Sequence, residues 1–188
     1  VDDLLDVSRI NQGKVTLRRE VVDWVDIVQA GVEIVRPLVE ARRHVLALVL
    51  PPRGTTFSHG DPTRLTQVVG NLLSNAAKYT DRGGRIEVRV SRASPDVVLE
   101  VSDDGIGMAS ELLPRVFDLF VQAEQSADRT QDGLGIGLYQ LARLARPGPP
   151  PDHGAGRLRL GAPCAHDPHH RRHGHRQDVA VVRAGAAG

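Results

Sequence analysis

Asp61–Thr80 reads DPTRLTQVVGNLLSNAAKYT, and this stretch predicts the helix around which the rest of the chain is arranged. Asp61 suits a helix N-cap, and the proline after it suits the first helical position. At 100° per residue, one arc of the helix is apolar and carries Leu65, Val68, Val69, Leu72, Leu73 and Ala76. An adjoining arc, the polar strip, carries Asn71, Asn75, Lys78 and Tyr79. This strip suits a metal ion, an anion and a flat ring, although an amphipathic helix with ordinary polar flanks also explains the stretch by itself.

The composition bounds the kind of protein. A chain of 188 residues allows one or two domains, and a formal net charge of +1 gives no reason to expect nucleic-acid or membrane binding. No apolar run is long enough to predict a transmembrane helix in this piece. The single cysteine, Cys164, excludes an internal disulfide and fits a reducing compartment, so we expect a cytoplasmic location.

Helical and strand patterns alternate along the chain. Val1–Asn11 reads as the end of a helix, and a second helix is expected from Asp23 to about Arg43, kinked or split at Pro37. Strand patterns occur at Lys14–Val22, Val45–Leu50, Thr55–His59, Arg85–Ser91 and Val97–Ser102, the last two forming an antiparallel hairpin. This order predicts the α+β class, as a two-layer α/β sandwich with helices on one face of a mixed sheet.

Two glycine-rich segments suit a bound phosphate or purine. Asp103–Gly107 (DDGIG) follows a strand, where a carboxylate could accept a hydrogen bond from an exocyclic amine, or could simply satisfy a tight turn. Gly133–Gly137 (GLGIG) precedes a helical pattern that runs to about Ala145, so it could cradle an anion or act as a hinge. Between them Phe117 and Phe120 fit either the core or the base of a lid.

Together these segments resemble the ATP-binding domain of sensor histidine kinases, a Bergerat-type member of the superfamily that includes DNA gyrase and the heat-shock chaperone. The asparagine box matches NLLSNAAKYT, the glycine boxes match DDGIG and GLGIGL, and the phenylalanine box matches RVFDLF. The resemblance covers roughly residues 1–146. It implies that residues 1–13 end a dimerisation and phosphotransfer helix, and that residues 14–146 form the ATP-binding catalytic domain.

The resemblance also implies roles for individual residues. Asn75 would coordinate Mg²⁺ with Asn71 close by, Lys78 would contact the phosphates, Tyr79 would pack near the adenine and Asp103 would accept from its N6 amine. The nucleotide site would be completed by Gly105, Gly107, Gly133, Leu134, Gly135, Gly137 and Leu138. Asn71 and Lys78 are the expected catalytic residues.

Asn71 bears on the type of reaction. The ATP-hydrolysing relatives carry a glutamate at this position as the general base that activates water. An amide cannot take a proton, so the chain is expected to hold Mg-ATP for attack by an external nucleophile.

No stretch of the chain matches the phosphoacceptor motif, a histidine followed by Glu or Asp, Leu or Phe, and Arg. His44 is expected at the surface and His59 at a strand end. The acceptor histidine is therefore expected on a dimerisation helix outside this chain, in a homodimeric kinase that feeds a response regulator receiver domain. The full-length kinase could carry a membrane anchor elsewhere. The alternatives are a degenerate fragment without activity and a serine kinase of the anti-sigma type.

Residues 147–188 change abruptly to a Pro-, Gly-, His- and Arg-rich composition. The family ends in a helix, a Gly-Gly turn and two strands, whereas Pro147 and the prolines after it stop the helix here. We interpret this tail as the product of a frameshift near residues 140–147 that removed the closing strands and left a disordered segment. A metal site is the rival interpretation, and it would use Cys164, His166, His169, His170, His173 and His175, whose spacing matches no regular module.

Overall fold

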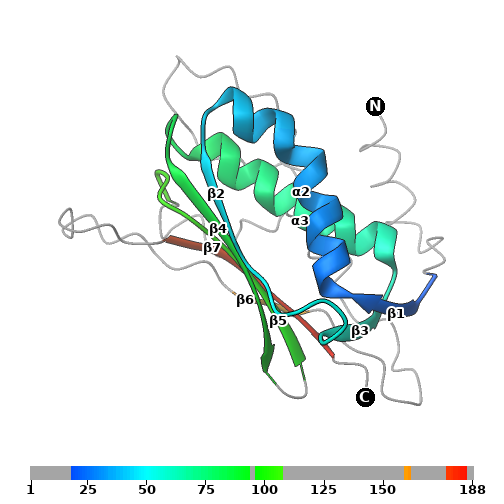
Figure 1. Cartoon of the computed structure of the whole chain (residues 1–188). Helices are drawn as coiled ribbons and strands as arrows, with labels where there is room; N and C mark the ends of the chain where they lie inside the picture. The colour runs from blue at the N-terminus through cyan, green and yellow to red at the C-terminus, as the bar shows by residue number, and fades with distance from the viewer. Residues whose placement is uncertain (1–17, 94–95, 108–158, 162–176, 186–188) are drawn as a thin grey trace, which may run out of the picture.

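The computed structural model describes residues 18–93, 96–107, 159–161 and 177–185. Two helices, α2 (Trp24–Ala41) and α3 (Pro62–Tyr79), pack together on one face of a sheet (Figure 1). The sheet has the strand order β2-β4-β5-β7-β6, with bounds Val45–Val49, Arg85–Ala93, Asp96–Asp103, Gln177–Gly185 and Arg159–Gly161. β2 runs parallel to β4, and the other neighbours are antiparallel, so the sheet is mixed. The predicted two-layer α+β sandwich is confirmed.

α3 forms as the sequence predicts. The Asp61 side chain caps it by accepting from the Arg64 N–H at 3.2 Å, and proline occupies the first turn. The predicted apolar stripe is buried, and the most enclosed of its members (Val68, Val69, Leu72, Leu73 and Ala76) are at most 1% exposed. Because the helix continues to Tyr79, the whole polar strip lies on regular helical backbone.

α2 is a single helix of 18 residues that contains Pro37, so of the two expected effects of this proline, a kink or a split, the split is wrong. Proline removes the donor to the carbonyl of Glu33, and both residues are exposed, where water can satisfy that carbonyl. The helix ends at Ala41, two residues earlier than predicted, because Arg43 has a left-handed φ of 58°.

Trp24 fixes the start of α2 to a small second ladder. This ladder pairs β1 (Glu20–Asp23) antiparallel with β3 (Phe57–Gly60). The Trp24 side chain is fully buried, and its indole N–H donates to the Ser58 Oγ at 2.9 Å. β1 begins at Glu20, so the prediction of a strand over Lys14–Val22 is wrong for Arg18 and Arg19, whereas residues 14–17 lie outside the described residues.

The predicted hairpin of β4 and β5 is confirmed, with both strands longer than expected. Its register runs from Ile86 opposite Asp103 to Ala93 opposite Asp96. This pairing brings Asp103, at the end of β5, next to the start of β4 and beneath the end of α3. The hairpin therefore positions the DDGIG segment.

The expectation that the closing strands are missing is wrong. β7 pairs antiparallel with β5 along its length, and β6 pairs with β7. Val179–Val182, which by itself is too short to support a fold, lies inside this nine-residue strand because β5 offers it an edge of hydrogen-bonding groups. The expectation of disorder is likewise wrong for these two segments. The other residues of the tail, including the Cys and His set, lie outside the described residues.

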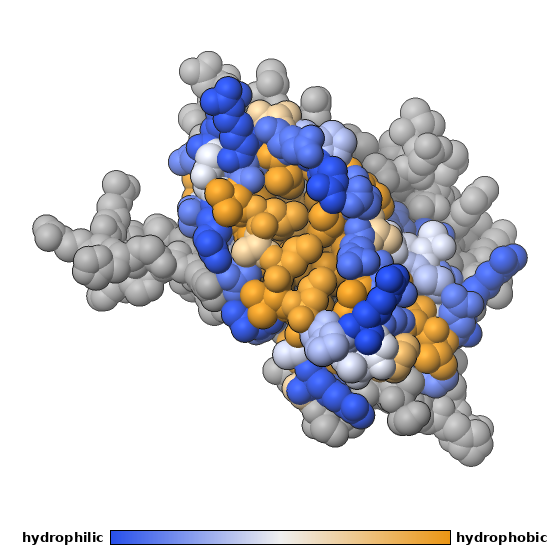
Figure 2. All heavy atoms as spheres, viewed as in Figure 1, coloured by the Kyte–Doolittle hydropathy of each residue, from blue (hydrophilic) through white to orange (hydrophobic). Residues whose placement is uncertain are grey.

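β2 forms one edge of the sheet and exposes apolar side chains. Val45, Leu48 and Val49 are 56%, 42% and 40% exposed. Figure 2 shows the apolar surface gathered where β2 runs beside α2. Among the described residues, no helix is long and apolar enough to cross a membrane.

Candidate nucleotide site

The C-terminal end of α3 is closed by groups from several other segments. The last four carbonyls of a helix lack intrahelical partners, and they need donors from elsewhere. The Ala76 carbonyl accepts from the Thr80 N–H at 3.0 Å, and the Tyr79 carbonyl accepts from the Ile106 N–H at 3.2 Å. The second bond joins the asparagine-box helix directly to the glycine loop, the name used from here for Asp103–Gly107.

The two remaining carbonyls are capped from the segment between α2 and β2. Nη1 of Arg42 donates to the Lys78 carbonyl at 3.0 Å, and Nε2 of His44 lies 3.0 Å from the Ala77 carbonyl. His44 is 8% exposed, so the expectation of a surface histidine is wrong. The backbone of Ala77 and Lys78 is therefore held by the side chains of His44 and Arg42, to which the sequence analysis gave no role in the site.

The glycine loop approaches α3 so closely that Gly105 has no room for a side chain. A Cβ there would lie 2.5 Å from the Tyr79 carbonyl oxygen and 2.7 Å from Oδ1 of Asp103. Oδ1 of Asp103 also accepts from the Gly105 N–H at 2.9 Å. The structure thus brings the asparagine box on α3 together with the first glycine box in the glycine loop. Asp103 lies at this junction of α3 with the glycine loop.

The two aspartates of the loop differ in their surroundings. Asp104 is exposed, and its Oδ1 accepts from the Arg85 N–H at 2.8 Å, so it fastens the loop to β4. Asp103 is 5% exposed, and burial raises the pKa of its carboxyl, an effect opposed mainly by the hydrogen bond from the Gly105 N–H. The Thr80 hydroxyl approaches this carboxyl and also lowers its pKa, but without reaching good hydrogen-bond geometry. Of the two carboxyls, Asp103 is the one suited to recognise a buried donor.

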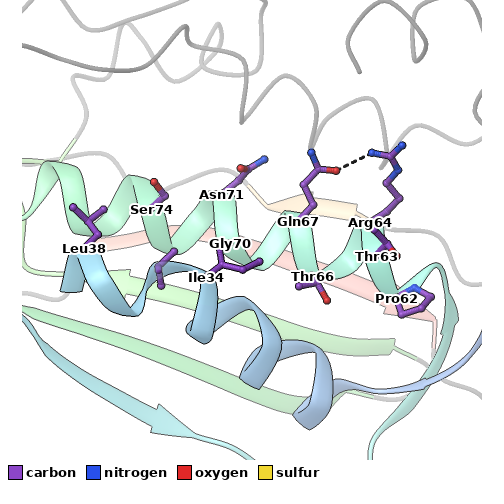
Figure 3. A pocket seen from close by; sticks show the side chains of 11 residues that line it. Ile34, Leu38, Pro62, Thr63, Arg64, Thr66, Gln67, Gly70, Asn71 and Ser74 are labelled. Carbon is purple, nitrogen blue, oxygen red and sulfur yellow. Dashed lines mark hydrogen bonds between the residues drawn. The ribbon is translucent and has the colours of Figure 1, made fainter. Parts of the chain in front are cut away.

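The polar strip of α3 is longer than the sequence analysis proposed. A groove of about 760 Å³ follows the outer side of the helix pair. Figure 3 shows Asn71, Ser74, Gln67 and Arg64 pointing to one side of α3, with Nη1 of Arg64 donating to Oε1 of Gln67 at 2.9 Å. Spacings of three and four residues from Arg64 to Asn71 could have revealed this extension.

Asn75, Lys78 and Tyr79 continue from Asn71 towards the closed end of the helix, and each is partly buried. On a helix, Asn71, Asn75 and Lys78 share one face, so two amide oxygens and one ammonium follow each other along it. Among the described residues, no group of three His, Cys, Asp or Glu could hold a metal ion. The amide oxygens still fit Mg²⁺, which keeps several waters and takes its negative ligands from a nucleotide's phosphates. Gly107 lies at the end of the described loop, whereas Gly133, Leu134, Gly135, Gly137 and Leu138 lie outside the described residues.

Curated relatives of this chain include a sensor kinase/phosphatase and a histidine-protein kinase. It is 33% identical over 149 residues to the autoinducer 2 sensor kinase/phosphatase LuxQ of Vibrio parahaemolyticus, covering 77% of this chain and 17% of that protein. It is 37% identical over 142 residues to the non-motile and phage-resistance protein of Caulobacter vibrioides, covering 73% and 17%. With the signal transduction histidine-protein kinase BaeS of Escherichia coli it shares 31% identity over 138 residues, covering 73% and 29%. This chain thus spans less than a third of each of these relatives.

Solved structures share the fold. The histidine kinase AdeS of Acinetobacter baumannii superposes with a TM-score of 0.67 at 18% identity, covering 100% of this chain and 77% of that chain. A full-length ShkA in complex with AMPPNP gives a TM-score of 0.69 at 23% identity, covering 99% and 35%. The family model described as histidine kinase-, DNA gyrase B-, and HSP90-like ATPase matches residues 60–177, which is more than half of the 188 residues and reaches beyond the change in composition. The chain belongs to this family of ATPases.

Proposed function

We propose that this chain binds Mg-ATP and transfers its γ-phosphoryl group to a histidine on a dimerisation helix outside this chain, in two-component signal transduction. The observation that carries the proposal is the junction of α3 with the glycine loop. It places a buried carboxyl, Asp103, at the end of a helix face that presents Asn71, Asn75 and Lys78. The names of the relatives, which include sensor and histidine kinases, support the same proposal.

In this proposal the nucleotide lies along α3, with the adenine at the C-terminal end of the helix and the phosphates towards Asn71. Asp103 accepts from the adenine N6 amine, and Tyr79 packs near the ring. Lys78 contacts the phosphates, and Asn75 with Asn71 provides oxygens for Mg²⁺. Positioning and charge neutralisation supply most of the catalysis in such a transfer.

The residue type at Asn71 favours transfer over hydrolysis. An imidazole nitrogen of the acceptor forms the new bond to the γ-phosphorus while the bond from that phosphorus to the bridging oxygen of ADP breaks. The acceptor is itself the nucleophile, so no side chain of this chain has to activate water. An amide at position 71 cannot act as a base, which slows the competing attack by water.

The partners follow from the same proposal. They are the acceptor helix of a homodimeric kinase and a response regulator receiver domain, with the catalytic part in the cytoplasm. A serine kinase of the anti-sigma type is a second candidate within the same superfamily, and the helical pattern of residues 1–11 favours the histidine kinase over it. The third candidate is a degenerate fragment that does not bind nucleotide, and the composition of residues 147–188 is the observation that suggests it.

Calorimetric titration of the full chain with Mg-ATP tests the first step. We expect binding that weakens about 10- to 100-fold in Lys78→Ala, since hydrogen bonds to charged groups contribute about 1.5–3 kcal/mol. Asn75→Asp should also weaken binding without unfolding the chain. Arg36→Ala is the matched control, because Arg36 is an exposed cation paired with Glu33 on α2. Unchanged affinity in both site variants would contradict the proposed site, and no binding by the wild-type chain would favour the degenerate fragment.

Adding a separate phosphoacceptor hairpin and γ-labelled ATP tests the second step. Label that is stable in base and lost in acid on the hairpin histidine supports histidine kinase activity. Acid-stable label on a serine instead would support the anti-sigma type of kinase.

A further inference from the structure

The groove beside the helix pair has an apolar side and a polar side. Ile34 and Leu38 of α2 form the apolar side, and Arg64, Gln67 and Asn71 of α3 form the polar side (Figure 3). Ile34 is 62% exposed, so its apolar surface is available to a partner seated in the groove. A groove with these two sides suits an amphipathic helix, which lays its apolar face into such a groove.

The groove continues from the reacting end of the proposed nucleotide site. Asn71 and Ser74 line one end of it, and Pro62 lines the other. At 1.5 Å per residue, Asn71 lies about 12 Å along the helix from Tyr79, and Arg64 lies about 10 Å further on. Because the proposed function puts the adenine near Tyr79 and the phosphates towards Asn71, the groove lies beyond the γ-phosphate. A nucleophile in line with the departing ADP has to approach from that side.

The charge of the groove indicates which side chains its partner carries. Among the described residues that line the groove, Arg64 alone is charged. Its Nη1 donates to Oε1 of Gln67 at 2.9 Å, which holds the guanidinium against the helix. A guanidinium has several N–H donors, so it can hold Gln67 and bind a carboxylate at the same time. Arg64 is partly buried, where salt screens an ion pair less than on the open surface. An acidic side chain of the partner therefore complements this position.

We propose that this groove is the docking surface for the phosphoacceptor helix, with apolar side chains of that helix on Ile34 and Leu38 and an acidic side chain on Arg64. The inference rests on the proposed function. It adds the surface that presents the acceptor histidine to the γ-phosphate. Arg64 is a positioning residue in this arrangement, since it holds the acceptor helix and does not touch the nucleotide.

Two substitutions test the two sides of the groove separately. Arg64→Gln removes the charge and keeps the cap of α3, because that cap uses the backbone N–H of Arg64. Ile34→Ala removes exposed apolar surface and places the better helix former in α2. Arg36→Gln is the matched control for charge, because Arg36 is an exposed cation of α2 that does not line the groove. Circular dichroism checks that all three variants are folded.

The experiment follows labelling of the separate phosphoacceptor hairpin by the full chain and γ-labelled ATP, at increasing hairpin concentration and at low and high salt. Calorimetry gives the ATP affinity of each variant. For Arg64→Gln we expect a KM for the hairpin about five- to ten-fold higher, a weaker dependence of that KM on salt, and unchanged ATP affinity. Ile34→Ala should raise the same KM by about five- to ten-fold and keep the wild-type dependence on salt. Arg36→Gln should keep the wild-type KM.

Several results would overturn the inference. If the wild type labels the hairpin and both groove variants keep its KM, the acceptor helix does not dock here. If these variants instead lose self-association in sedimentation experiments, the groove binds a second copy of the chain. If Arg64→Gln weakens ATP binding as much as it raises the KM, the guanidinium acts on the nucleotide. If the wild type does not label the hairpin, the proposed function fails and the inference falls with it. Labelling by the wild type thus distinguishes the two failures.

Discussion

The glycine loop packs tightly against α3 at Gly105, and Gly105→Ala tests whether this junction determines nucleotide binding. The added Cβ would lie 2.5 Å from the Tyr79 carbonyl oxygen and 2.9 Å from the Tyr79 carbonyl carbon. Both of these are backbone atoms at the end of a packed helix, so they cannot rotate away as a flexible side chain could. The loop has to move away from α3.

The cost can be worked out from the contacts that such a movement breaks. Overpacking of this kind destabilises proteins by about 1–3 kcal/mol. Losing the bond from the Ile106 N–H to the Tyr79 carbonyl adds about 0.5–1.5 kcal/mol. We therefore expect the free energy of unfolding to fall by about 1.5–4.5 kcal/mol. Because the new carbon would also lie 2.7 Å from Oδ1 of Asp103, that carboxyl must shift, and ATP affinity should fall by at least about ten-fold.

Gly70→Ala is the matched control, because it makes the same chemical change at a site with room. A Cβ at Gly70 would meet Ile34 at 3.7 Å, which is an ordinary contact. Alanine in a helix interior is favoured over glycine by about 0.5–1 kcal/mol, so this variant should be more stable with ATP affinity little changed. Urea unfolding followed by circular dichroism and titration with Mg-ATP measure both quantities. If Gly105→Ala keeps the stability and the ATP affinity of the wild type, the junction does not determine nucleotide binding.

Three further predictions concern the core and the buried carboxyl. Gly31→Ala should lower the free energy of unfolding by about 1–3 kcal/mol, because its Cβ would lie 2.5 Å from Cγ1 and 2.8 Å from Cβ of Val69, and adding Val69→Ala should recover only the part of that loss due to Cγ1 if helix packing is the cause. Trp24→Phe should cost about 1–3 kcal/mol for the unpaired hydroxyl of buried Ser58, besides the lost volume, and the Ser58→Ala background should abolish the hydroxyl part. Because burial raises the pKa of Asp103, its ionisation opposes folding, so stability relative to Asp103→Asn should be greatest below about pH 4 and decline as the pH rises through the raised pKa. Parallel unfolding curves of wild type and Asp103→Asn across this range would contradict the assigned burial effect.

The parts of the fold that were predicted correctly depend on local patterns. The stripe of α3 follows from residues three and four apart, and the β4–β5 hairpin follows from two alternating runs separated by a short turn. The Asp103–Gly107 loop was identified in the same way, from glycines that follow a strand. Each of these signals is contained within about 20 residues of the chain.

The parts that were missed depend on distant partners. His44 follows two arginines, which gives it the appearance of a surface residue. Its hydrogen-bond partner, the Ala77 carbonyl, lies 33 positions away in the chain. β7 was missed because its pattern is weak in an arginine- and glycine-rich tail, and it becomes a strand by pairing with β5, which ends 74 positions before it begins (Gln177 against Asp103). No window of local sequence contains either partner.

At the closed end of α3 the same residues serve both stability and recognition. The carbonyls of Lys78 and Tyr79 are held by Arg42 and by the N–H of Ile106, and the side chains of these same two residues are among those proposed to meet the nucleotide. A change that frees one of these carbonyls lets the last turn fray, and the attached side chain then loses its position. Loss of affinity after such a change therefore does not identify a residue that contacts ATP. Contacts can be assigned only from variants that keep the caps, such as Lys78→Ala, which removes an ammonium and leaves the backbone carbonyl bonded to Arg42.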